Sequence, residues 1–233
     1  METVIDAHEI SKIYEEEAVP VYAVDNVHLH IEKGEFIALV GPSGSGKTTL
    51  LNILGGLDYP SRGKVMIGGM NITNMKENEL IDFRLHHIGF VFQAFNLIPV
   101  LTAKENVELV MLMQHVSKRD REKKTIDLLT AVGLSDRLNS KPSELSGGQQ
   151  QRVAVARALA SKPKFILADE PTANLDSKSA TNLLDIMARL NKEENMTFVF
   201  STHDPRVIEK ARRVITLIDG KISSDEKRQE KAL

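Results

Sequence analysis

Five short apolar runs, rich in β-branched and aromatic residues, mark the 233-residue chain. They occupy residues 36–40, 88–92, 164–168, 197–201 and 213–218. Such runs are typical of strands buried on both faces. Because several of them precede segments with helical patterning, the sequence predicts an α/β fold with a mostly parallel sheet flanked by helices. The first 35 residues alternate weakly instead, as in NVHLHIEKGE, which predicts an N-terminal antiparallel β region solvated on one face.

Between residues 94 and 161 the pattern changes to helical spacing, with no candidate strand. The sequence TAKE at Thr102–Glu105 is a capping box that opens a helix through about Gln114. A second helix is predicted to end at Gly133, and a third runs from about Gln149 to Ala160. We therefore expect a helical subdomain, 94–161, inserted into an α/β core formed by 1–93 and 162–233.

Composition narrows the class of protein. The 30 basic and 32 acidic residues are mixed along the chain and give a net charge of −2, which argues against a nucleic-acid partner. There is no cysteine for disulfides or thiolate metal sites, and no apolar run approaches the ~18 to 20 residues of a membrane span. With no apolar run resembling a signal peptide at the amino terminus, we expect a cytoplasmic location, with any membrane role exerted through a partner. The closing residues 223–233 predict a solvated tail.

The sequence GPSGSGKT at Gly41–Thr48 fits the pattern G-x-x-x-x-G-K-[ST] of a phosphate-binding loop. A buried strand before it and an apolar helix after it favour this interpretation over a flexible turn with a chance lysine. Backbone N–H groups would surround phosphate oxygens, Lys47 would reach the β- and γ-phosphates, and the Thr48 hydroxyl would ligate Mg²⁺. The expected nucleotide-binding residues of this loop are Gly41, Pro42, Ser43, Gly44, Ser45, Gly46, Lys47, Thr48 and Thr49.

Polar side chains follow three of the predicted strands. Asp169 and Glu170 end the strand FILADE, where Asp169 would hold Mg²⁺ and Glu170 would polarise the attacking water. His203 follows the strand FVFS and is expected to contact the γ-phosphate. Gln93 ends IGFVFQ, and its amide could touch both Mg²⁺ and the water. Open α/β sheets bind ligands along the rim where such strands end.

A second anion site is predicted at LSGGQ, residues 145–149, where a Ser-Gly-Gly turn stands directly before a helix. Such a turn aims backbone N–H groups at an anion, although the same residues could merely cap the helix.

Taken together, these motifs resemble the ATP-binding subunits of ABC transporters, over nearly the whole chain. LSGGQ matches the signature of that family and lies, as there, between the phosphate loop and the Asp-Glu strand. PTANLD (171–176) resembles the segment whose aspartate, here Asp176, crosses the dimer interface. His203 and Gln93 fall where the family has its switch histidine and glutamine.

The resemblance implies a phosphate-loop NTPase core and a head-to-tail homodimer that forms on ATP. The signature turn of one copy, formed by Ser146, Gly147, Gly148 and Gln149, would complete the ATP site of the other. The resemblance also places an aromatic residue on adenine, for which Tyr14 fits and Tyr22 is a rival.

Longer stretches, such as LADEPTANLDS, resemble the lipoprotein-release, macrolide-efflux and cell-division branch. This implies an ATP-hydrolysing motor, peripheral to the cytoplasmic face of the cell membrane, that drives an integral membrane permease. Phe95, Leu97 and Ile98 would line the groove for the permease or else form core. The alternatives are a soluble non-transport ABC ATPase or regulator, and a phosphate-loop kinase. The sequence names no substrate and no direction of transport.

Overall fold

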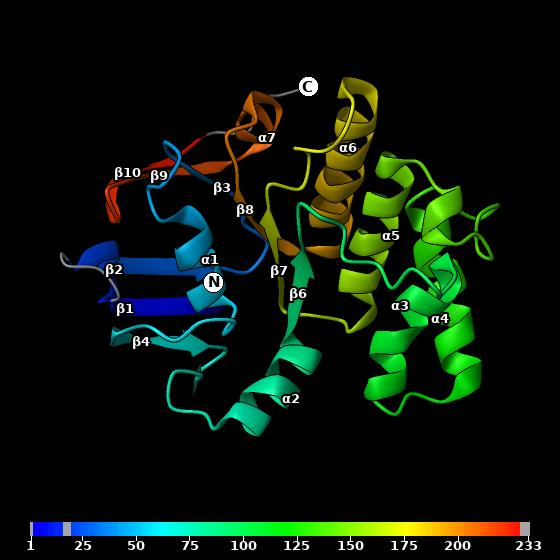
Figure 1. Cartoon of the computed structure of the whole chain (residues 1–233), viewed down its shortest axis with the longest axis horizontal. Coiled ribbons are helices and arrows are strands. Elements are labelled where there is room, and N and C mark those ends of the chain that lie inside the picture. The colour runs from blue at the N-terminus through cyan, green and yellow to red at the C-terminus, as the bar shows by residue number, and fades with distance from the viewer. Residues whose placement is uncertain (1, 16–19, 229–233) are drawn as a thin grey trace.

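The computed structural model describes residues 2–15 and 20–228 of the chain (Figure 1). Within these residues the chain forms a larger, mostly parallel sheet and a smaller antiparallel sheet, with helices packed around them. The predicted α/β fold class is therefore confirmed.

The larger sheet has the strand order β10-β9-β3-β8-β7-β6. Strands β9, β3, β8, β7 and β6 run parallel, and β10 is antiparallel to β9. Each of the five predicted runs forms a strand with ends within one residue of the expectation. The strands are β3 (Phe36–Val40), β6 (Ile88–Val91), β7 (Phe165–Asp169), β8 (Thr197–Ser201), β9 (Arg213–Ile218) and β10 (Lys221–Lys227).

The prediction of a solvated tail from residue 223 is wrong for its first part. Residues 223–227 belong to β10, because the chain turns back at Asp219–Gly220 and pairs with β9. The guanidinium of Arg213, nearly buried, binds the Asp225 carboxylate at 2.7 Å and adds a side-chain anchor to that pairing. The rest of the expected tail, 229–233, lies outside the described residues.

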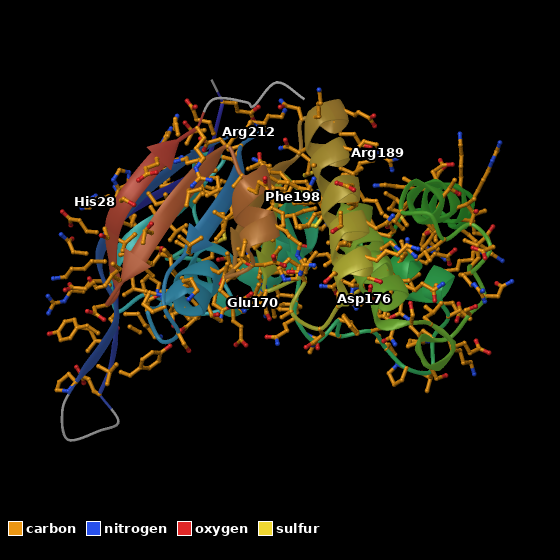
Figure 2. The ribbon with its side chains drawn as sticks, turned by 90° about the horizontal axis from the view of Figure 1, so that it is seen from above. His28, Glu170, Asp176, Arg189, Phe198 and Arg212 are labelled. Atoms are coloured by element: carbon orange, nitrogen blue, oxygen red, sulfur yellow. The ribbon has the colours of Figure 1, made fainter. Side chains whose placement is uncertain are left out.

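The smaller sheet confirms the predicted antiparallel region and has the order β2-β1-β4-β5. Its outward positions are polar, as at His28 and His30, while Val27, Leu29 and Ile31 between and beside them are buried. Figure 2 shows His28 at the outer side of the molecule. The strands are β1 (Thr3–Tyr14), β2 (Val21–Glu32), β4 (Arg62–Ile67) and β5 (Met70–Asn71).

The parallel sheet has a hydrophobic core on each face, because alternate residues of its strands point to opposite sides. On β3, for example, Phe36 and Ala38 join one core, and Ile37 and Leu39 join the other. The smaller sheet packs on one face together with α1 (Lys47–Leu54) and α2 (Glu77–His87). The other face carries α3 (Ala103–Met113), α4 (Lys118–Ala131), α5 (Gly147–Ala160), α6 (Ser177–Glu194) and α7 (Pro205–Lys210).

Residues 94–161 contain α3, α4, α5 and the short 3₁₀ helix Pro142–Glu144, without a strand. Thr102 and Glu105 form the expected capping box. Helix α5 begins at Gly147, two residues before the predicted start, because Ser146 is its N-cap. Val107 and Met111 of α3 share one buried core with Leu183 of α6, so the helical segment packs closely on the core domain. The boundaries of a separate subdomain stay a prediction.

Candidate functional site

The phosphate loop joins β3 to α1 in a conformation that glycine allows. Gly41, Gly44 and Gly46 all have positive φ, and a Cβ on Gly46 would collide with the carbonyl oxygen of Ala23 on β2. Gly46 caps α1 without a side-chain hydrogen bond, and the first turn of α1 holds no acidic residue. The N-terminus of α1 therefore keeps its electropositive end uncompensated, which suits a phosphate.

Lys47 and Thr48 lie at the mouth of this loop. The Lys47 ammonium donates to the carbonyl oxygens of Gly41 (2.9 Å) and Pro42 (2.8 Å), so it spans the cradle that phosphates would occupy. The Thr48 hydroxyl donates to both carboxylate oxygens of Asp169, at 3.1 and 3.2 Å. The structure thus joins two of the expected Mg²⁺ ligands from distant parts of the sequence.

This pair of hard oxygen ligands fits Mg²⁺. The ion usually takes only one or two protein oxygens and completes its shell with phosphate and water. No group of three His, Cys, Asp or Glu side chains poised to hold a metal occurs among residues 2–15 and 20–228.

Glu170 and His203, two of the expected catalytic residues, follow β7 and β8 and lie together. His203 Nδ1 lies 2.7 Å from Glu170 Oε1, and the Thr202 hydroxyl donates to Glu170 Oε2 at 3.3 Å. Glu170 adopts a left-handed backbone (φ 44°), held by the hydrogen bond from its N–H to the Ser201 carbonyl. Strained non-glycine residues of this kind cluster at functional sites, and here the turn places the carboxylate at the sheet edge.

Gln93 follows β6, the neighbour of β7 in the sheet. Its backbone carbonyl accepts a hydrogen bond from the Asn174 amide at 3.0 Å, which ties it to the loop that follows Glu170. The Gln93 side chain is exposed, and its contact with Mg²⁺ or water stays a prediction.

The order of the strands explains how these groups meet. β3, β8, β7 and β6 are adjacent and parallel, so their carboxyl ends present the phosphate loop, His203, Asp169–Glu170 and Gln93 side by side. In Figure 2, Glu170 and Asp176 lie toward one side of the ribbon and Arg212, which precedes β9, lies toward the other.

The signature turn forms the N-terminus of α5. The Ser146 hydroxyl accepts from the Gln149 N–H (3.3 Å), and Gln149 Oε1 accepts from the Ser146 N–H (2.9 Å). The Ser146 N–H, expected to face an anion, is thus engaged in this structure. The N–H groups of Gly147 and Gly148 occupy the first turn, where no helical acceptor exists, and remain suited to an anion.

The two helix ends that are expected to bind anions lie on opposite faces of the sheet. Helix α1 belongs to one core and α5 to the other, and Figure 1 shows them on either side of β6 and β7. The chain therefore does not fold its own signature turn over its own phosphate loop.

Asp176 is the N-cap of α6 and accepts the N–H groups of Lys178 and Ser179 at 3.0 Å. Hydrogen bonds from Ser179 and Lys178 keep its pKa below the ordinary value. Asp176 is exposed, and its predicted place at a dimer interface stays a prediction.

Tyr14 and Tyr22, the two candidates for stacking on adenine, are both exposed. Tyr14 pairs with Val21 and Tyr22 with Ile13, so the two rings leave opposite faces of the β1–β2 ladder. The Tyr14 hydroxyl donates to Asp58 at 3.3 Å, and Lys12 Nζ lies 5.2 Å from its ring centre. Only one of the two can serve a given nucleotide, and the assignment to Tyr14 stays a prediction.

Sequence reasoning missed a polar clasp beside the catalytic pair. Asp204, nearly buried, accepts hydrogen bonds from the Thr172 hydroxyl (2.7 Å) and from Arg206, and so joins the loops after β8 and β7. Burial raises the pKa of Asp204, but the hydrogen bonds from Arg206 and Thr172 outweigh burial and lower it to about 2. The sequence did offer one indication that Asp204 lies at the site, because it directly follows His203.

Replacing Asp204 with asparagine is expected to destabilise the fold by about 2 kcal/mol at pH 7, because the native pKa lies below the ordinary 3.8. A lowered native pKa stabilises the fold above pH 4, and this contribution is lost as pH falls toward 2. Urea unfolding between pH 7 and pH 3 should show the stability difference between the two proteins narrowing at the acid end. Asp185→Asn, which breaks an exposed ion pair with Lys210, is the control and should change stability by under about 0.5 kcal/mol. A constant gap between Asp204→Asn and the parent across this range would contradict the assignment.

The phosphate loop on this sheet, with Thr48 and Asp169 meeting beside it, defines a phosphate-loop nucleoside triphosphatase. The glycine-led start of α5 is the expected second anion site. The family described as "ABC transporter" matches residues 24–173. The chain belongs to this family of ATP-binding cassettes, which bind and hydrolyse ATP.

Two named relatives match most of this chain. The chain is 43% identical over 223 residues to the lipoprotein-releasing system ATP-binding protein LolD of Legionella pneumophila, covering 96% of this chain and 98% of that one. It is 49% identical over 211 residues to the macrolide export ATP-binding/permease protein MacB of Campylobacter jejuni, covering 89% of this chain but 33% of that larger protein.

A solved structure also matches. The ATP-binding cassette MJ0796 of Methanocaldococcus jannaschii, in a dimeric post-hydrolysis state bound to ADP and Pi, superposes with a TM-score of 0.89 and 44% identity. The match covers 97% of this chain and 100% of that one. The resemblance to the lipoprotein-release and macrolide-efflux cassettes is thus confirmed. Across residues 2–15 and 20–228, no helix has the length and apolar character of a membrane span.

Proposed function

We propose that the chain is the ATP-hydrolysing motor of a membrane transporter and works as a head-to-tail homodimer with ATP between the copies. The observation that carries this proposal is the placement of the phosphate loop and the signature turn on opposite faces of one sheet. In two copies related by a two-fold axis, the signature turn of each copy can complete the ATP site of the other. The dimeric state of the similar MJ0796 cassette, bound to ADP and Pi, supports a dimer.

In the proposed reaction, the phosphate loop and Lys47 hold the β- and γ-phosphates. Glu170 accepts a proton from the attacking water as the new P–O bond forms, and the bond from the γ-phosphorus to the β-phosphate oxygen breaks. His203 orients the γ-phosphate. Thr48, Asp169 and Gln93 would hold Mg²⁺, which would supply positive charge against the charge that develops on the phosphates. The N–H groups of Gly147 and Gly148 from the other copy bind the γ-phosphate, so hydrolysis weakens the dimer.

An apolar groove of about 430 Å³ offers a place for the permease. It lies between the core and the helical segment 94–161, which we propose as a subdomain. The stretch after Gln93 contributes only Asn96 to this groove; Leu97 packs on the hydrophobic core, and the Phe95 ring lies beside Gly147. Its lining includes Leu57, Ile81, Arg84, Phe90, Val110, Met113 and Arg157.

Three of the apolar side chains that line the groove, Leu57, Ile81 and Met113, are 43–53% exposed. Large apolar side chains that gather on an exposed surface often mark a binding site for another protein. We propose that a cytoplasmic segment of the permease packs there and that the chain thereby resides at the cytoplasmic face of the membrane. The similarity to LolD and to the ATP-binding part of MacB favours a partner of the lipoprotein-releasing or macrolide-export type.

Met113→Glu is expected to release the chain from membranes, because a carboxylate would lose its hydration when the groove is covered. The measurement is the share of tagged full-length chain that sediments with membranes of its own host. Leu112→Glu, an equally exposed neighbour on α3 outside the groove lining, should stay bound. If the parent chain itself is absent from membranes while hydrolysing ATP, the alternative of a non-transport ABC ATPase is favoured instead.

A further inference from the structure

One fully buried polar side chain, Gln151, is not explained by nucleotide binding. It lies in the second turn of α5, two residues after Gln149, with 0% of its surface exposed. A carboxamide in such a place costs free energy unless its hydrogen bonds are made, so its partners indicate what it does.

Gln151 bonds to two loops of the catalytic edge. Its Nε2 donates to the Pro171 carbonyl at 2.8 Å and to the Phe92 carbonyl at 3.1 Å. Pro171 directly follows Glu170, and Phe92 directly precedes Gln93. Because both partners are acceptors, the donor end of the amide has to face them, and Oε1 is left buried without a partner.

We propose that Gln151 is a positioning residue that couples the signature helix to the catalytic edge by fixing Gln93 and Glu170 relative to one another. The inference rests on the proposed function, in which these two residues act on water and γ-phosphate. One planar amide holds both carbonyls, so a shift of α5 carries the two loops together.

The energetics favour movement as a unit. If either loop moved without α5, a buried carbonyl and a buried N–H would lose their hydrogen bond, and a buried polar group left unpaired is costly. The bond from the Asn174 amide to the Gln93 carbonyl links the same two loops a second time. Engagement of Gly147 and Gly148 at the start of α5 is thereby transmitted to the site that the same chain builds at its sheet edge.

The test is steady-state ATP hydrolysis by the full chain. Gln151→Met keeps the length of the side chain and removes both donors, and we expect kcat to fall by about tenfold or more with KM for ATP changed less than about threefold. KM should hold because the phosphate loop belongs to the opposite face. The control is Gln150→Met, also on α5, which removes one hydrogen bond to the Leu145 carbonyl before the helix and should keep kcat within about twofold.

Two further measurements separate positioning from loss of folding. In the Glu170→Gln background, Gln151→Met should lower the residual rate no further, because residues that act as a unit are non-additive. The kcat of Gln151→Glu should rise toward that of the parent as pH falls from 8 to 6, since only the protonated carboxyl can donate a hydrogen bond to a carbonyl. Three results would each overturn the proposal. The first is a Gln151→Met variant whose kcat and KM both change, and the second is a double variant in which the losses of Gln151→Met and Glu170→Gln multiply. The third is a pH profile of Gln151→Glu that runs parallel to that of the parent.

The same measurements distinguish this inference from the proposed function. If Glu170→Gln hydrolyses ATP at the parent rate, the proposed catalytic role fails. If Glu170→Gln is inactive and Gln151→Met retains the parent kcat, only the coupling role fails.

Discussion

Glu170→Gln is expected to slow ATP hydrolysis by about 10²- to 10⁴-fold while ATP still binds. The amide keeps the shape of the side chain and its place at the strained end of β7, but it can no longer accept a proton from water. The phosphate loop, Lys47 and the Thr48–Asp169 pair are unchanged by this substitution. Turnover of ATP measured together with calorimetric affinity separates the two effects.

The same variant should trap the ATP-bound dimer, because the γ-phosphate that both copies hold is not removed. Light scattering should give about the 25.9 kDa of one chain without ATP and about twice that mass with ATP. Glu209→Gln, an exposed control on α7, should turn over like the parent and leave no lasting dimer. A monomer that has ATP bound would contradict sites completed by a second copy.

The second prediction concerns complementation between two inactive chains. Lys47→Ala loses the ammonium at the phosphate loop, and Gly147→Glu places a carboxylate where the other copy's γ-phosphate is expected. Each variant alone should be inactive. A mixed head-to-tail dimer contains one site with both defects and one with neither, so mixing should restore up to about a quarter of the parent activity per chain.

Gly147→Glu is expected to leave the fold intact. Gly147 does not have positive φ, a Cβ there would meet its neighbours at ordinary distances of 3.6 Å or more, and a carboxylate at a helix N-terminus is favourable. Gly147→Ala keeps the N–H groups and the charge, and should stay active. If the mixture stays as inactive as its components, each chain completes its own site and the head-to-tail arrangement is wrong.

Local sequence patterns predicted those helices and strands whose residues all share one environment or whose hydrogen bonds are local. The apolar runs became β3 and β6–β9 because strands buried on both faces need apolar residues throughout. The capping box at Thr102 was predictable because its hydrogen bonds span three residues. The strand β10 was missed because its charged residues resemble a tail until β9 supplies a pairing edge.

The candidate site divides in the same way. Gly41–Thr48, Asp169, Glu170 and His203 could be predicted because their neighbours in sequence are the strands and helices that position them. Asp204 and Gln151 could not, since their partners are 32 and 20 or more residues away. Gln151 has a trace in the pattern: Gly148, Gln151 and Val155 share the buried side of α5, where a lone carboxamide indicates a partner in the interior.

The sequence by itself determined the groups that are available for chemistry: a phosphate loop, strand-end carboxylates and a glycine-led helix start, each fixed by contacts within a few residues. Only the tertiary structure decided that β3, β8, β7 and β6 lie in this order and that α1 and α5 occupy opposite faces. The physical reason is that parallel strands distant in sequence pair to bury both faces of one sheet, and local preference does not select which strands become neighbours. That packing brings Thr48 to Asp169 and Glu170 to His203, and it keeps the two anion-binding ends of one chain apart.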